Sequence, residues 1–226
     1  NEITAHLAAM REQIGEGGFL TVFIAQPLEM FYLILQEAMV YHFLDWPETH
    51  GRAMAEVEQT DHFLIDCAAA AGADMIMLGG AGTEIFAPDM IREHIVRPSV
   101  GFVRHAHDAG LFTLMHCCGR TKVLLDHGWF DDLRPTVFES FTQAPLGDIE
   151  DVSAAAHALP DEVFFKGGLS LDRLRRGDAD EAAAMTRRAI EQFGDRRYIA
   201  AGTCAILTGT PRENLLAVTA TAAECE

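Results

Sequence analysis

The sequence predicts an α/β fold of the (β/α)₈ TIM-barrel type, with about six of the eight βα units present in this chain. Short, continuously apolar runs alternate with longer helical patterns, and most of these runs are closed by glycine or a polar turn. Buried parallel strands have such uninterrupted apolar sequences, so the alternation indicates a parallel sheet covered by helices on both faces. Polar residues that can bind metals or take part in catalysis also lie at or just after the ends of the runs. Barrels place their active sites at these strand ends.

The elements follow one another in a regular order. The predicted strands cover residues 19–24, 74–78, 111–115, 136–139, 162–166 and 198–201. The predicted helices cover residues 28–43, 47–71, 88–109, 121–126, 149–159, 178–193 and 211–225. Pro47 occupies the first turn of its helix, where its missing N–H does no harm. A closed barrel needs eight strands, so we predict a single barrel domain over residues 1–226 that lacks its N-terminal portion; an open sheet is the alternative.

Composition excludes several classes of partner. The 226 residues carry a formal net charge of −17, whereas nucleic acid and anionic membranes are bound through basic surfaces. No apolar run approaches the roughly 20 residues that would cross a bilayer. The five cysteines are odd in number and lack a disulfide-framework spacing, which favours a reducing compartment. We therefore expect a cytoplasmic protein, with no nucleic-acid or membrane partner and with a homodimer as a candidate assembly.

Three residues suggest a soft-metal site. His116 and Cys118 lie two positions apart at a predicted strand end, which places both side chains on one face and Cys117 on the other. Cys204 follows another apolar run. One imidazole and two thiolates suit Zn²⁺, and three protein ligands leave a fourth position open for substrate. The competing interpretation is a pair of buried thiols beside a core histidine.

Several motifs resemble those of the uroporphyrinogen decarboxylase superfamily, within it the zinc-dependent, corrinoid-linked methyltransferase branch. The motifs are Gly72-Ala73-Asp74 before a strand, His116-Cys117-Cys118-Gly119 with Asp126 downstream, Gly167-Gly168-Leu169 after a strand, and Gly202-Thr203-Cys204 followed by Thr210-Pro211-Arg212-Glu213-Asn214. The resemblance extends over nearly the whole chain from about Phe19 onward. His-x-Cys-Gly alone is a weak signal, but its combination with a cysteine seven residues before Pro211 is more specific.

This resemblance implies a (β/α)₈ barrel in which His116, Cys118 and Cys204 bind zinc. It also implies an enzyme, a methyltransferase that moves a methyl group between a corrinoid or a methylated small molecule and a thiol-type acceptor at the zinc. The chain has no Asp-x-His-x-x-Gly segment of the kind found in corrinoid-binding domains. A corrinoid would therefore arrive on a separate partner protein. The methyl donor and the acceptor are not specified by the sequence.

Two carboxylates and one lysine are further candidates for the site. Glu139, at a predicted strand end, and Glu84, in a glycine-rich loop, are each candidates for a fourth zinc ligand, a partner of a ligand, or a general base. An exposed loop carboxylate is the alternative for Glu84. Lys166 is either a contact for an anionic substrate or a solvated charge at a strand end.

Two other functions compete with methyl transfer. One is a metal-free lyase that resembles uroporphyrinogen decarboxylase and acts on a tetrapyrrole or another acid. The other is a non-catalytic barrel that serves as a binding module. Stoichiometric zinc with thiol-dependent methyl transfer would favour the methyltransferase, whereas zinc without turnover would favour the binding module.

Overall fold

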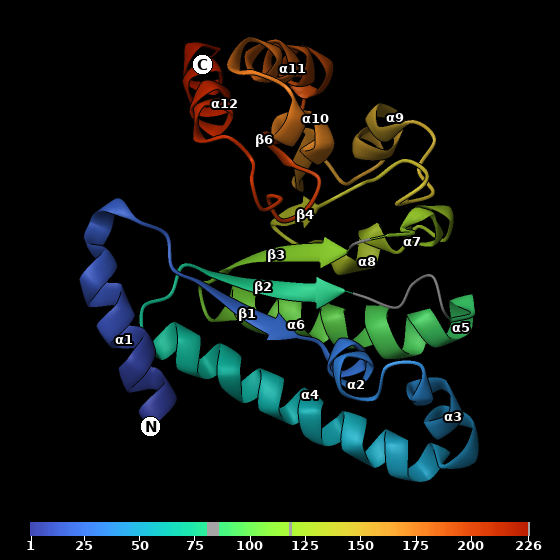
Figure 1. Cartoon of the computed structure of the whole chain (residues 1–226). Coiled ribbons are helices and arrows are strands. Elements are labelled where there is room, and N and C mark those ends of the chain that lie inside the picture. The colour runs from blue at the N-terminus through green and yellow to red at the C-terminus, as the bar shows by residue number, and fades with distance from the viewer. Residues whose placement is uncertain (81–85, 118, 226) are drawn as a thin grey trace. The chain divides into compact units, whose positions relative to one another are not determined.

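The computed structural model describes residues 1–80, 86–117 and 119–225, and Figure 1 shows its helices and strands. Its strands form one sheet in chain order: β1 (Thr21–Ala25), β2 (Met75–Gly80), β3 (Phe112–Cys117), β4 (Val137–Glu139), β5 (Phe164–Leu169) and β6 (Tyr198–Gly202). The pairs β1–β2, β4–β5 and β5–β6 are parallel. The predicted α/β class with six strands is confirmed.

The chain divides into two compact units. Unit 1 comprises Asn1–His116 and Asp132–Thr136, and unit 2 comprises Cys117–Asp131 and Val137–Glu226. The helices before β4 are α1 (Glu2–Ile14), a short turn of 3₁₀-helix (Gly15–Gly17), α2 (Pro27–Leu35), α3 (Ala38–Asp45), α4 (Pro47–Ala70), α5 (Pro88–Ile91), a π-helical turn (Arg92–Val96), α6 (Arg97–Asp108), α7 (Lys122–Asp126) and α8 (Phe130–Leu133). Those after β4 are α9 (Val152–His157), α10 (Leu171–Arg176), α11 (Ala179–Phe193) and α12 (Arg212–Glu224).

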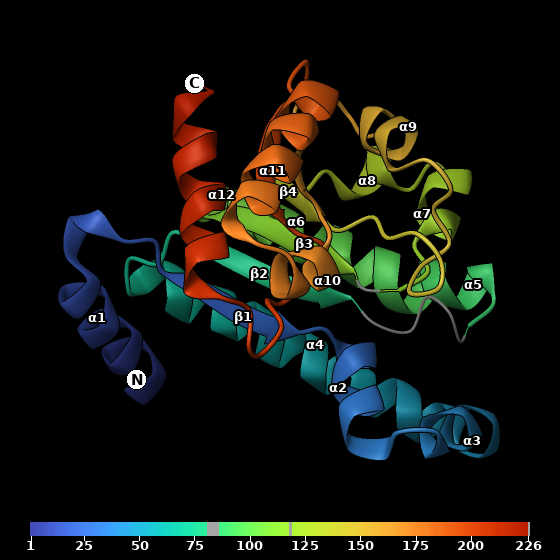
Figure 2. The ribbon, with the colours of Figure 1, turned by 45° about the horizontal axis from the view of Figure 1, so that its top comes forward.

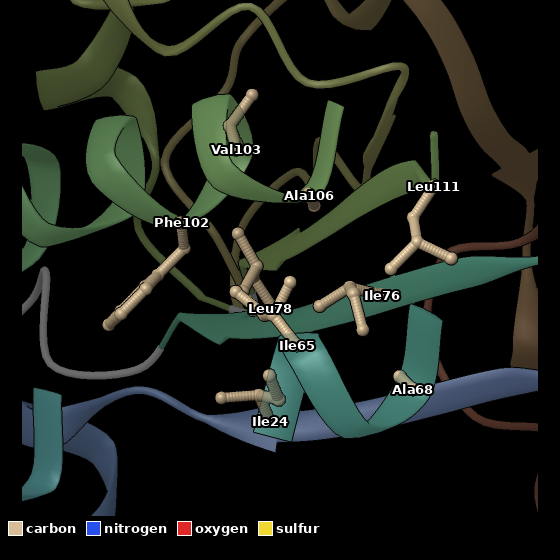
Figure 3. Packing of buried hydrophobic residues seen from close by; sticks show 9 residues of the cluster. All are labelled: Ile24, Ile65, Ala68, Ile76, Leu78, Phe102, Val103, Ala106 and Leu111. Carbon is tan, nitrogen blue, oxygen red and sulfur yellow. The ribbon is translucent and has the colours of Figure 1, made fainter. Parts of the chain in front are cut away.

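The core of unit 1 lies between β1, β2 and two long helices. Ile24 of β1 and Ile76 of β2 meet Ile65 of α4 and Phe102 of α6, all of them almost completely buried (Figure 3). Figures 1 and 2 both show α4 running along these strands. The apolar runs predicted as strands β1 and β2 thus form the inner layer of unit 1, and α4 and α6 cover it.

Asp74 explains the Gly72-Ala73-Asp74 motif. Its Oδ2 accepts hydrogen bonds from the backbone N–H of Leu20, at 2.6 Å, and from Nη1 of Arg11, at 2.7 Å. One carboxylate therefore joins the beginnings of β1 and β2 to helix α1. Helix α1 was not among the elements predicted from the sequence.

One predicted helix is divided in two. Residues 28–43 were predicted as continuous, but α2 ends at Leu35 and α3 begins at Ala38. Gln36 has a φ of 52°, a left-handed conformation that a right-handed helix cannot continue through. The apolar periodicity persists across this break, so the pattern alone indicated one helix.

The core of unit 2 is aromatic. Phe138, Phe141 and Phe165 are completely buried, with ring centroids 4.8 Å apart for Phe138–Phe141 and 5.7 Å apart for Phe141–Phe165. Phe193 of α11 continues the stack, 5.1 Å from Phe165. These contacts anchor β4, β5 and α11 around one cluster, because tilted and offset rings pack favourably at such spacings.

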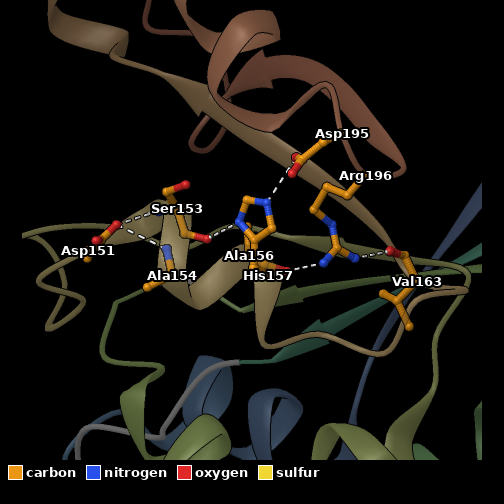
Figure 4. Close-up of polar contacts among 8 residues, drawn as sticks. All are labelled: Asp151, Ser153, Ala154, Ala156, His157, Val163, Asp195 and Arg196. Carbon is orange, nitrogen blue, oxygen red and sulfur yellow. Dashed lines mark hydrogen bonds and ion pairs between the residues drawn. The ribbon is translucent and has the colours of Figure 1, made fainter.

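A polar network ties α9 to the segment before β6 (Figure 4). The guanidinium of Arg196 donates to the carbonyl oxygens of Ala156 and Val163, the latter at 2.7 Å. Beside it, His157 contacts Asp195 through Nε2 at 2.9 Å. Arg196 thus links the C-terminal turn of α9 to the residue before β5.

In the parts of the chain that the structure describes, every helix is too short or too polar to cross a bilayer.

Candidate functional site

His116 lies near the C-terminal end of β3. Its side chain is partly exposed, whereas that of the next residue, Cys117, is fully buried. This difference agrees with the predicted alternation, in which Cys117 faces away from the site. Cys118 lies outside the described residues, so its metal-binding role stays a prediction.

Cys204 follows the end of β6 by two residues and is partly buried. The residue before it, Thr203, accepts a hydrogen bond at its carbonyl oxygen from the hydroxyl of Ser140. Ser140 directly follows Glu139, the last residue of β4. The structure therefore ties the Cys204 loop to the Glu139 strand end within unit 2.

Glu139 is buried, and its partner is Lys166. The ammonium of Lys166 lies 2.8 Å from Oε1 of Glu139, and the side chains are 28% and 6% exposed. Neither predicted role of Lys166, substrate contact or solvated charge, included this ion pair. The ion pair joins the end of β4 to β5, because the two residues are paired in the register of these strands.

Unit 2 also contains a cavity of about 860 Å³, whose lining among the described residues includes Thr203 but not Glu139, Lys166 or Cys204. Phe141 and Thr142 after β4, Gly168 near the end of β5, and Thr203 and Leu207 after β6 contribute to its lining. Gly168 has a φ of 86°, and a Cβ there would lie 2.9 Å from the Tyr198 hydroxyl, so a larger residue would strain this wall. The volume of the cavity is within the range of small-molecule binding sites.

The strand ends of unit 1 carry a second polar group. Gln26, directly after β1, donates from Nε2 to the carbonyl oxygen of Gly79 at 2.6 Å. The hydroxyl of Ser99, in α6, lies 2.6 Å from Gln26 Oε1. Both side chains are buried, so this chain of hydrogen bonds fixes the end of β1 against β2 and α6.

Glu29 lies next to this group, with its carboxylate against the backbone of Gly79. It lies in the first turn of α2, and its Oε2 is buried without a hydrogen-bond partner among the described residues. Burial raises the pKa of Glu29, and the electrostatic interaction with His116 partly opposes that effect. A carboxylate and an imidazole of unit 1 thus lie within electrostatic reach of each other.

The sequence-predicted residues can now be placed. Glu139 and Lys166 are in direct contact, and the Cys204 loop is joined to them through Ser140. Glu84, like Cys118, lies outside the described residues. Within the described ranges, no group of three or more His, Cys, Asp or Glu side chains is arranged to hold a metal ion.

The sequence analysis missed Gln26 and Glu29. A signal for them was present, because Gln26 and Glu29 come two and five residues after the predicted strand 19–24, around Pro27, where the next helix begins. Polar residues at that position in a parallel α/β fold lie on the functional face. They were overlooked because the surrounding sequence is otherwise apolar.

Comparison with known families gives one match over almost the whole chain. The model of the family described as uroporphyrinogen decarboxylase (URO-D) matches residues 2–225. No curated protein matches the sequence.

Several solved structures share the fold. A methyltransferase from Methanosarcina mazei superposes with a TM-score of 0.79 at 18% identity, over 98% of this chain and 63% of that one. A B12-independent methionine synthase from Shewanella sp. W3-18-1 gives a TM-score of 0.63 at 12% identity, over 98% of this chain and 65% of its own. A putative vitamin-B12-independent methionine synthase from Listeria monocytogenes gives 0.63 at 16% identity, over 99% and 69%. The chain thus spans less than two thirds of the first two proteins.

Proposed function

Because the chain belongs to the uroporphyrinogen decarboxylase family, we propose that it is a zinc-dependent methyltransferase that transfers a methyl group to a thiol-type acceptor. The methyl donor in this proposal is a corrinoid carried by a partner protein or a methylated small molecule. The observation that carries the proposal is the donor set His116, Cys118 and Cys204, in the spacing discussed above. The fold shared with a methyltransferase and with two methionine synthases supports the same reaction class.

The side chains of His116, Cys118 and Cys204 carry donor atoms that suit zinc. Two thiolates and one neutral imidazole form a set that zinc accepts, and they leave one coordination position for a substrate. His116 and Cys204 each lie at the C-terminal end of a strand or just beyond it, the position from which parallel α/β folds present their chemistry. Bound there, zinc would act as a Lewis acid that favours the deprotonated form of an acceptor thiol.

The chain's own residues would bind and orient the acceptor. The unit 2 cavity combines apolar walls, such as Phe141 and Leu207, with polar groups, such as Thr142. Apolar walls exclude water and so protect a nucleophilic sulfur from solvation. The Glu139 carboxylate, held by Lys166, is a candidate acceptor for the thiol proton.

The balance of the reaction is simple. A thiol and a methylated corrinoid give a thioether, a corrinoid reduced by two electrons at cobalt, and one proton. The carbon–cobalt bond breaks, the carbon–sulfur bond forms, and the electron pair of the broken bond stays on cobalt.

The proposal can be tested with methylcobalamin as the donor and a panel of small thiols as acceptors. We expect thiol-dependent loss of the methylcobalamin absorption band that requires zinc and is abolished in Cys204→Ser. Cys225→Ser removes an exposed thiol near the chain end and should behave like the wild type. Turnover that survives complete zinc removal would contradict the proposal, and bound zinc without turnover for any donor would favour a binding module.

A further inference from the structure

Two helices of unit 1, α4 and α6, are joined by a row of polar side chains. Glu58, His62 and Asp66 follow one another at intervals of four residues in α4, so they lie on one face of that helix. Arg97 and His105, both in α6, contact this face. At one end of the row, the guanidinium of Arg97 donates to both carboxylate oxygens of Glu58, at 3.2 and 3.1 Å. These polar contacts join the helices in addition to their apolar core.

The rings of His62 and His105, called the imidazole pair below, share one hydrogen bond. Nδ1 of His62 lies 2.7 Å from Nδ1 of His105. A hydrogen bond between two ring nitrogens contains one proton, because one nitrogen must donate and the other must accept. The His62 ring also lies 4.9 Å from the ring of Phe102, a fully buried residue of α6. The pair therefore holds a ring of α4 directly against α6.

Asp66 sets the direction of this hydrogen bond. Nε2 of His105 lies 2.8 Å from Oδ1 of Asp66. An ionised carboxylate only accepts, so Nε2 of His105 carries a proton. In the neutral ring Nδ1 of His105 is then the acceptor, and Nδ1 of His62 is the donor. The chain of hydrogen bonds thus runs from His62 through His105 to Asp66, and it leaves Nε2 of His62 with its lone pair.

The imidazole pair can take up one proton and keep its hydrogen bond, but it cannot take up two. The first added proton binds at Nε2 of His62, which leaves both Nδ1 atoms unchanged. A second proton must bind at Nδ1 of His105, the acceptor. Two N–H groups on two positively charged rings would then face each other across 2.7 Å, so the rings must separate.

The surroundings of the pair disfavour a high positive charge. Burial of the His62 ring, and then the nearness of His105, lower the pKa of His62; the carboxylates of Glu58 and Asp66 oppose this effect from α4. Glu58 is in addition bound by Arg97 of α6. Since the pKa of His62 is lower in the folded protein than its ordinary value of 6.5, the stability that the pair contributes is present above that pH and is lost as the pH falls below it.

We propose that the imidazole pair is an acid-sensitive link between α4 and α6, closed while the two Nδ1 atoms share one proton and open when each carries its own. The link goes beyond the proposed function, because neither histidine belongs to the zinc set or lines the unit 2 cavity. Helix α6 leads into β3, which contains His116. Opening of the link therefore loosens the helix that precedes this strand.

Hydrogen exchange of the backbone amides of α6 tests the link. Protection from exchange is measured between pH 5 and pH 8, corrected for the intrinsic effect of pH, in protein that carries Asp61→Asn. This background removes the Asp61 carboxyl, whose raised pKa changes stability with pH in the opposite direction. We expect the protection of α6 to fall by about tenfold or more from pH 8 to pH 5.

Three substitutions in this background assign the fall to the pair. His62→Gln and His105→Gln each remove one of the two titrating rings and should each flatten the pH dependence. The double variant should resemble either single variant, because both changes remove the same link. His107→Gln is the matched control. It removes the other imidazole of α6, whose pKa is also lowered by burial, and should leave the fall in protection intact.

Nitrogen-15 NMR of the histidine rings reads the shared proton itself. At pH 8 the pair should give one protonated and one unprotonated Nδ1, identified by the loss of their signals in His62→Gln and His105→Gln. At pH 5 both Nδ1 atoms should be protonated. Two unprotonated Nδ1 atoms at pH 8 would contradict the hydrogen bond on which the link depends.

The exchange experiment can also overturn the inference. Protection of α6 that does not fall on acidification would contradict it, and so would a fall of equal size in His62→Gln. A fall that disappears in His107→Gln would assign the effect to the wrong imidazole. None of these results depends on bound zinc, so the proposed function is tested separately.

Discussion

The ammonium of Lys166 donates a hydrogen bond to Oε1 of Glu139 over 2.8 Å, between residues that are paired in the register of β4 and β5. Ser140, next to Glu139, holds the carbonyl of Thr203, next to Cys204. The strand ends of unit 2 therefore share one connected set of polar contacts, and the lysine is a structural partner of the carboxylate.

Replacing Lys166 should lower the free energy of unfolding, because Glu139 is buried beside it. Lys166→Met removes the cation from a carboxylate whose side chain is 6% exposed. We expect a loss of about 2–3 kcal/mol in the free energy of unfolding, because breaking one side of a buried ion pair leaves a charge poorly compensated. Urea unfolding monitored by circular dichroism measures this change.

The matched variants are Lys166→Arg and the double substitution Glu139→Gln with Lys166→Met. The arginine variant keeps the charge and should lose much less stability. The double variant should recover part of the loss, because no buried charge remains. Equal destabilisation in all three would show that packing of the lysine stem, and not the ion pair, determines stability here.

Asp61 should make stability depend on pH. It lies on α4, is 3% exposed, and its Oδ2 has no hydrogen-bond partner among the described residues. Burial, with a smaller contribution from Glu58, raises the pKa of Asp61 to about 7. The folded protein therefore binds the Asp61 proton more tightly than the unfolded chain does between about pH 4 and pH 7.

The direction of the effect follows from this difference in pKa. The contribution of Asp61 to the free energy of unfolding is fully present below the pKa that Asp61 has in the unfolded chain. It falls as pH rises from about 4 to about 7 and stays low at higher pH. The total change is on the order of 4 kcal/mol. We expect Asp61→Asn to be more stable than the wild type at pH 8 and to lose this part of the pH dependence, as measured by urea unfolding at pH 5 and pH 8.

The exposed neighbour Glu56 supplies the control. Glu56→Gln removes one negative charge from the same helix and so reports how far general repulsion in this acidic chain contributes. A pH profile of Asp61→Asn that coincides with those of the wild type and of Glu56→Gln would contradict the assignment.

Arg196 should contribute more to the free energy of unfolding than the adjacent Arg197 does. Arg196→Met leaves the carbonyl oxygens of Ala156 and Val163 without these donors, and we expect a loss of about 2 kcal/mol. Arg197 is exposed and lies over the ring of Phe164 at 5.4 Å, so Arg197→Met should cost less than about 1 kcal/mol. Thermal unfolding of the two variants side by side gives the comparison, and the reverse order would contradict it.

The strands were predictable because their apolar runs are short and end in glycine or polar turns. Helix continuity was harder, since the apolar pattern gives no sign of the left-handed Gln36 between α2 and α3. Helix α1 was missed because none of its residues is buried, so it lacks a strong apolar stripe. It is attached by a distant ion pair, between Arg11 and Asp74, and by the packing of Leu7 against the core of unit 1.

For the site, the sequence identified residues by type and by strand-end position. It could not identify pairings such as Glu139 with Lys166, because these depend on the register of two strands separated by a helix. Glu29 was missed for a related reason. The Gly79-Gly80 pair indicates a loop and gives no sign that the Glu29 carboxylate lies against the backbone of Gly79.

Zinc content is the decisive measurement for the proposed site of His116, Cys118 and Cys204. The chain is purified without oxygen, since oxidised thiolates would lose the metal, and zinc per chain is measured by elemental analysis for the wild type, His116→Ala, Cys118→Ser and Cys204→Ser. We expect about one zinc per wild-type chain and a marked loss in all three variants. Wild-type protein without zinc, or undiminished zinc in Cys204→Ser, would contradict it.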